Sequence, residues 1–204
     1  MGGASIPVPI DDHVQCVYQD SLIFVVTGWS NTGNVPNVQI YNPSLNSWEV
    51  GTSLINSAIY TAFGASGHII GDTIYYHGGA SGSSFNARNF LRKGFINPND
   101  PTDITWLTKE DAPGIAGYRS ACSGFESTVF WLGGSSVSSN YDGIAYNGSG
   151  GVAPSARALH LNNDLNIYSD ERNQPDGVMD LRGIAKLSGN RWMVCGGMDS
   201  TQTV

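Results

Sequence analysis

Four short apolar runs end in glycine and recur along the chain: SLIFVVTG (residues 21–28), DTIYYHGG (72–79), STVFWLGG (127–134) and NRWMVCGG (190–197). The last glycines of successive runs lie 51, 55 and 63 residues apart. A strand-like stretch and a turn containing Gly, Asp or Ser precede each run, which is the pattern of a β-hairpin. Self-similarity at a regular spacing indicates a repeat architecture in which every unit contains such a hairpin.

A second hairpin follows each glycine-ended run after a polar loop. It is clearest in VQIYNPSLNSWEVG (38–51), where two aromatic residues flank an Asn-Pro turn. Similar stretches at 94–106 and 161–168 repeat this arrangement in the second and third units. The predicted pairs of large side chains are Tyr41 with Trp48, Phe95 or Ile96 with Trp106, and Leu161 with Tyr168.

Four strands per unit, a terminal Gly-Gly and a Tyr–Trp pair resemble the Kelch repeat, which forms one four-stranded antiparallel blade of a β-propeller. The resemblance is to the bacterial Kelch-type propellers of the galactose oxidase central domain and the N-acetylneuraminate epimerases. It implies an all-β fold with one propeller domain at 1–204. The implied blades span about 13–51, 62–108 and 119–168, with a partial blade at 178–204.

The number of blades bears on whether the chain is whole. Propellers close with about four to eight blades, and this chain provides three and part of a fourth. We therefore expect it to be a fragment of a longer protein with roughly six blades. A complete ring of four blades is the alternative.

The chain is acidic and poor in charged residues. Its net charge is −7, and charged residues make up 13% of it, against roughly 25% in an ordinary domain. So few Lys and Arg residues give no electrostatic grip on phosphates, which excludes nucleic acid as a partner. The longest uncharged apolar stretch, Leu22–Val26, is too short for membrane insertion.

The sequence predicts neither a metal nor a cofactor. Its three cysteines are widely spaced and form no CxxC pair, so they give no support for a metal site. No nucleotide-binding glycine motif lies between a strand and a helix.

The first residues, MGGASIPVPIDD, lack the basic and apolar regions of a signal peptide. The chain is therefore either cytosolic or without its true N-terminus. Low charge and many Gly, Ser and Asn residues favour an exported bacterial protein, periplasmic or extracellular.

Counting back 15 residues from each closing glycine gives four positions that should meet at the mouth of the central channel. They are His13, Gly64, Arg119 and Arg182. An arginine pair there suits a carboxylate or sugar hydroxyls, because a guanidinium donates hydrogen bonds in a fixed plane. The alternative is that each arginine pairs with a neighbouring group, such as Asp12 or Asp180.

Loops on the same face supply aromatic and polar candidates. The predicted ligand-binding residues are Arg119, Arg182, Trp29, Asn31, Tyr118, Tyr141 and Asp142. Tyr141 and Asp142 belong to a long insertion after Gly134, and the loop after Gly79 adds Arg92. Loops on a rigid scaffold often carry binding residues, and this mixture suits a carbohydrate. The alternative is that Trp29 packs beside its blade and the insertion only decorates the surface.

These patterns favour a non-catalytic module that binds a carbohydrate or a protein, because no nucleophile–base motif is present. The alternative that the resemblance implies is a sugar epimerase or mutarotase of the N-acetylneuraminate epimerase type. Its catalytic candidates would be Asp12, His13 and Asp180, with the arginines binding an anion. Copper chemistry of the galactose oxidase type has no support, because the histidines fall at different strand levels and no cysteine lies on a loop of this face.

Overall fold

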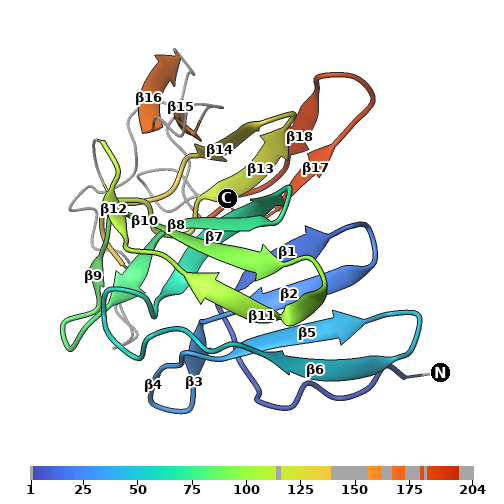
Figure 1. Cartoon of the computed structure of the whole chain (residues 1–204). Coiled ribbons are helices and arrows are strands. Elements are labelled where there is room, and N and C mark those ends of the chain that lie inside the picture. Colours follow the sequence, from blue (N-terminus) through green and yellow to red (C-terminus); the bar gives the residue numbers. More distant parts are fainter. Residues whose placement is uncertain are drawn as a thin grey trace.

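The computed structural model describes residues 2–113, 116–138, 156–161, 167–172, 180, 181 and 183–197. This part of the chain contains 18 strands and no helix, so the all-β prediction is confirmed. Its sheets lie side by side around a common centre (Figure 1). The strands β1 (Val14–Tyr18), β7 (Phe63–Ile70) and β13 (Ala121–Phe125) are the inner strands, and β7 contacts both of the others. None of the described segments forms a helix long and apolar enough to cross a membrane.

Three sheets contain four main strands each, and we call these sheets blades 1, 2 and 3. Blade 1 is β1, β2 (Leu22–Val26), β5 (Val38–Asn42) and β6 (Ser47–Gly51). Blade 2 is β7, β8 (Thr73–Ser81), β10 (Phe90–Asn97) and β11 (Asp100–Trp106). Blade 3 is β13, β14 (Thr128–Leu132), β15 (Ala156–Leu161) and β16 (Ile167–Arg172). All of their strand pairs are antiparallel.

Six short strands complete the described structure. The strands β17 (Ile184–Lys186) and β18 (Trp192–Val194) form a separate sheet, which we call blade 4. A small hairpin of β3 (Trp29–Ser30) and β4 (Gly33–Asn34) follows blade 1's second strand. The strands β9 (Asn86–Ala87) and β12 (Glu110–Asp111) pair with β8 and β10 of blade 2.

The core lies between blades because alternate residues of a strand face opposite neighbours. On β8, Tyr76 belongs to a buried cluster shared with blade 1, whose members include Val14 and Phe24. The adjacent residue, Tyr75, belongs to a second cluster shared with blade 3, where Trp131 is 2% exposed. Blade 2 therefore buries both of its faces, and each blade needs a neighbour to complete its core.

The observed register corrects two of the three predicted aromatic pairs. The opposed residues are Tyr41 with Trp48, Gly94 with Trp106, and His160 with Tyr168. The prediction is therefore right for blade 1 alone, where the two rings lie 4.9 Å apart. In blades 2 and 3 the true partner precedes the predicted residue, because a single sequence does not show how the longer turns set the register.

Gly94 has a packing role that its sequence position alone did not show. The indole of Trp106 lies directly over it, so a Cβ at this position would collide with the ring. The indole is held there by a hydrogen bond of 3.0 Å from its Nε1 to the Thr52 carbonyl oxygen, and it meets the Tyr76 ring edge-on. The absence of a side chain at Gly94 is thus what lets Trp106 cover this part of the blade.

Replacing Gly94 should therefore destabilise the protein. We expect Gly94→Ala to lower the free energy of unfolding by about 1–3 kcal/mol, because overpacking forces a fixed ring to move. Urea denaturation measures the change. Gly33→Ala is the matched control, since a Cβ at Gly33 meets open space. Equal midpoints for the two variants would contradict this packing argument.

Candidate functional site

A chain of backbone hydrogen bonds links the blades at the mouth of the channel. The amide of Gly64 donates to the carbonyl oxygen of Asp12 at 2.8 Å, and the amide of Arg119 donates to that of Gly64 at 2.7 Å. The amide of Leu181 in turn donates to the carbonyl oxygen of Arg119 at 3.0 Å. Asp12, Gly64, Arg119 and Leu181 therefore take corresponding positions in successive blades, and we call them the mouth residues.

The prediction that the mouth residue lies 15 positions before the closing glycine was wrong by one residue in blades 1 and 4. Asp12, not His13, corresponds to Gly64 and Arg119, and Leu181 takes this place in blade 4. The chain between the mouth and the closing glycine is one residue longer in blades 1 and 4 than in blades 2 and 3. Of the four counted positions, Arg182 lies outside the described residues, as do Tyr141 and Asp142 of the long insertion.

Three of the four mouth residues have an unusual backbone conformation. The φ angles of Asp12, Gly64 and Arg119 are 48°, 66° and 53°, which is the left-handed region. This conformation costs a residue with a Cβ about 1–2 kcal/mol. At Gly64 a side chain is also excluded by space, because its Cβ would meet the ring of Tyr118. The hydrogen bonds between blades offset the backbone cost and keep the mouth in one shape.

Arg119 joins three blades through its side chain. Its Nη2 lies 2.6 Å from Oδ2 of Asp12, and its Nη1 lies 3.4 Å from Oδ2 of Asp180. Burial by itself lowers the pKa of Arg119, but the hydrogen bond to Asp12 and the charges of Asp12 and Asp180 raise it above the ordinary value. The alternative interpretation of the sequence was that each arginine pairs with a neighbouring group such as Asp12 or Asp180, and in the structure Arg119 pairs with both aspartates.

A cavity of about 240 Å³ opens below these groups. Asp12, Gly64 and Arg119 border it, so three mouth residues do meet at one place. The next layers come from the positions one and three residues further along each inner strand. These lining residues are His13 and Gln15 in blade 1, Ala65 and Gly67 in blade 2, and Ser120 and Cys122 in blade 3.

Several of these lining residues were missed at the sequence level. Gln15, Ser120 and Cys122 attract no attention as motifs, and Ser66, which also lines the cavity, contacts Ser120 with 3.2 Å between the two hydroxyl oxygens. The strand register was the signal that could have found them. Once the mouth residue of each blade is known, counting one and three residues onward gives the positions that face the channel.

His13 is the titratable imidazole of this cavity. Burial lowers its pKa below the ordinary value, and the opposing charges of Asp12 and Asp11 do not reverse this. Its Nδ1 atom is buried and makes no hydrogen bond to another described residue. Hydrogen bonds with the Ile10 backbone and the Gln15 side chain oppose the lowering without reversing it, so the imidazole is neutral at neutral pH.

The predicted aromatic platform is not part of the cavity. Trp29 packs edge-on against Phe63 and Phe85 at 5.3 and 5.2 Å between ring centroids. Tyr118 has no exposed surface and lies against the same Phe63. Trp29 thus packs beside the blade, as the alternative interpretation had it, and Tyr118 offers no face for a sugar to stack on. Asn31 is exposed at the turn between β3 and β4, away from the cavity lining.

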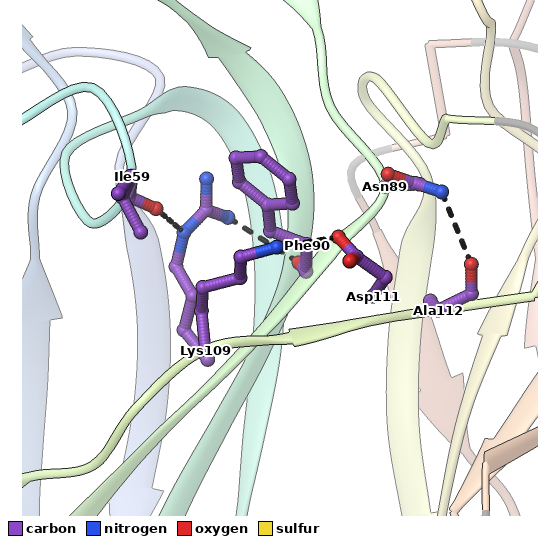
Figure 2. A network of polar contacts seen from close by, with 7 residues as sticks. Ile59, Asn89, Phe90, Lys109, Asp111 and Ala112 are labelled. Carbon is purple, nitrogen blue, oxygen red and sulfur yellow. Dashed lines mark hydrogen bonds and ion pairs between the residues drawn. The ribbon is translucent and has the colours of Figure 1, made fainter.

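The cations of the second loop are also engaged in packing. Arg92 is fully buried and donates hydrogen bonds to the carbonyl oxygens of Ile59 and Gly78. Burial lowers its pKa to about 10. Figure 2 shows Lys109 paired with Asp111 beside the Phe90 ring. Through Ile59, Arg92 fastens the connection between blades 1 and 2, whereas Lys109 and Asp111 follow the last main strand of blade 2. Arg92 is therefore not available to a ligand.

The described residues hold no obvious metal site. Within the described ranges, His, Cys, Asp and Glu side chains form no group of three that could hold a metal ion. The cavity lining contributes one imidazole, one carboxylate and the thiol of Cys122, whose pKa burial raises well above its ordinary value. What the arrangement can do chemically is donate and accept hydrogen bonds.

Comparison with known proteins supports the fold assignment. No family model matches the chain, and no curated protein matches it. Among solved structures it is similar to one titled "Structure of YjhT", with a TM-score of 0.61 and 16% sequence identity. The match covers 87% of this chain and 57% of that one, so the chain spans little more than half the length of that structure. At this identity the likeness shows the fold alone, which is that of a β-propeller.

The ion pair at the mouth should stabilise the protein measurably. We expect Arg119→Met to lower the free energy of unfolding by about 3–5 kcal/mol, because it removes a guanidinium 2.6 Å from a carboxylate that is 6% exposed. A double-mutant cycle with Asp12→Asn, followed by urea denaturation, should give a coupling energy of about 1–3 kcal/mol. Additivity within about 0.5 kcal/mol would show that the pair contributes nothing.

Proposed function

We propose that this chain is part of a Kelch-type propeller that binds a small polar ligand, a carbohydrate, in the cavity at its channel mouth. The observation that carries the proposal is the convergence of polar side chains from three inner strands on one cavity of about 240 Å³. Ligand sites are typically concave and contain a few convergent polar groups. The volume is slightly below the usual range of about 300–1,000 Å³, which favours a small ligand over a protein segment.

The lining supports carbohydrate over other small ligands. Hydroxyl groups both donate and accept hydrogen bonds, and Gln15, Ser66 and Ser120 offer both roles at fixed positions. These residues sit on or next to inner strands that are held by the hydrogen bonds between blades. A site built on such strands is preorganised, so little ordering of the protein opposes binding.

Filling the cavity should abolish binding. We expect Ser66→Leu to weaken the binding of monosaccharides by roughly tenfold or more, because a leucine side chain would occupy the space between blades 2 and 3. Saturation-transfer NMR and calorimetry with a monosaccharide panel would measure it. Asn31→Ala is the matched control, because Asn31 is exposed on the same face and does not line the cavity. If the Ser66→Leu variant bound monosaccharides as tightly as the parent protein, the binding site would not be this cavity.

One observation favours a second candidate function, a sugar mutarotase. Ring opening of an aldose needs a group that accepts and returns a proton, and the neutral imidazole of His13 borders the cavity. Asp12 and Asp180 are less suited to this role than they were at the sequence level, because both carboxylates are ion-paired with Arg119. His13 is thus the catalytic candidate that the geometry favours.

Mutarotation kinetics would test this candidate. If His13 is the base, the protein should accelerate anomer exchange of an aldose, and His13→Gln should reduce the acceleration by about 10²-fold or more. The lowered pKa means that the imidazole stays neutral as the pH falls through 6.5, so the rate should hold below that pH and fall only in more acidic buffer. If NMR or polarimetry gave an anomer-exchange rate equal to that in buffer alone, the mutarotase function would be wrong.

A further inference from the structure

The guanidinium at the cavity is already occupied by the protein itself. Arg119 is the one Lys or Arg among the described residues that line the cavity. Its two terminal nitrogens face different carboxylates, Asp12 at 2.6 Å and Asp180 at 3.4 Å. A ligand carboxylate is usually held by both nitrogens of one arginine side by side. That mode of binding is not open to an acidic ligand here unless Arg119 gives up its pairing with an aspartate.

The charge balance of the mouth also disfavours an anion. Among its described residues, Arg119 contributes one positive charge, and Asp12 and Asp180 contribute two negative charges. Asp11 adds a further carboxylate next to Asp12 in the sequence. The side chain of Asp12 is only 6% exposed, so displacing it from Arg119 would strip a nearly buried carboxylate of this ion pair.

The remaining lining groups are uncharged and suited to hydroxyls. Gln15, Ser66 and Ser120 carry neutral donors and acceptors. The Nε atom of Arg119 is buried and makes no hydrogen bond to another described residue, so a donor there is not used by the aspartates. The imidazole of His13 adds a neutral group, because burial lowers its pKa.

We propose that the cavity selects neutral sugars and rejects acidic ones, with the Asp12–Arg119–Asp180 cluster acting as the specificity determinant. This inference rests on the proposed carbohydrate function and narrows its substrate class. It replaces the role that the sequence suggested for the arginine, which was to hold a carboxylate. Asp180 sets the charge of the mouth in this scheme, although it is not among the residues that line the cavity.

A pair of ligands that differ at one carbon would test the selection. D-Galactose and D-galacturonate, and likewise D-glucose and D-glucuronate, differ only in a hydroxymethyl group against a carboxylate. Titrated into the full chain at low salt, the neutral sugar should bind roughly tenfold tighter or more than its uronate. Added salt should narrow the gap only in part, since the side chains of Asp12 and Asp180 are 6% and 26% exposed and partly buried charges are screened less than exposed ones.

An isosteric variant separates charge from shape. Asp180→Asn removes one negative charge and weakens one contact of Arg119, so uronate affinity should rise roughly tenfold while neutral-sugar affinity stays within about threefold. Unchanged uronate affinity in a variant that still binds the neutral sugar would contradict the role of Asp180. If the Asp180→Asn variant fails to fold, the affinities of the parent protein for the neutral sugars and the uronates decide whether the selection exists.

The two proposals fail in different ways. Binding of the uronate by the parent protein as tightly as the neutral sugar, or more tightly, would overturn the selection and leave the carbohydrate site in place. Binding of none of the four sugars would overturn the carbohydrate function and this inference with it.

Discussion

The structure depends on one close approach, in which neighbouring blades come near enough at the channel mouth for their backbones to hydrogen-bond. The three bonds from Gly64 to Asp12, Arg119 to Gly64 and Leu181 to Arg119 tie four blades into one rim. At two positions of blade 2, Gly64 and Gly67, a side chain would collide with the neighbouring blade. Gly64 lies against the Tyr118 ring, and Gly67, three residues further on, lies against Val14 of blade 1. The polar cavity exists because these strands meet without bulky residues between them.

The scarcity of positive charge shapes what this rim can bind. The chain has 10 Lys and Arg residues against 17 Asp and Glu, and two of its cations, Arg119 and Arg92, are used for structure. Arg119 bridges two aspartates from other blades, and Arg92 fastens the connection between blades 1 and 2 through backbone carbonyl oxygens. The uncharged polar side chains that remain in the cavity lining provide hydroxyl, amide and imidazole groups. Its chemistry is therefore that of neutral hydrogen bonding.

The fold was predictable from the sequence because its signal is local and repeated. An apolar run that ends in glycine shows in a single stretch, and four such runs at similar spacing define the blades. Register was harder, because it depends on how many residues each loop holds. Only blade 1 has the predicted Tyr–Trp pairing, and the count to the mouth failed by one residue at His13. The ion pair of Arg119 with Asp180 joins residues 61 positions apart. The sequence offered Asp12 or Asp180 as partners, but it did not show that one arginine meets both.

The same ion pair also bears on whether the cavity binds or transforms its ligand. Acid–base catalysis on a sugar usually employs two groups, one that removes a proton and one that supplies it. Of the three catalytic candidates, two aspartates are held by Arg119, and moving either from its place would weaken the link between blades. His13 is the one of the three that is not ion-paired with Arg119. For the proposed carbohydrate function, the cavity is therefore better suited to holding a sugar than to converting it, because two of the three groups that would do the chemistry hold the rim together.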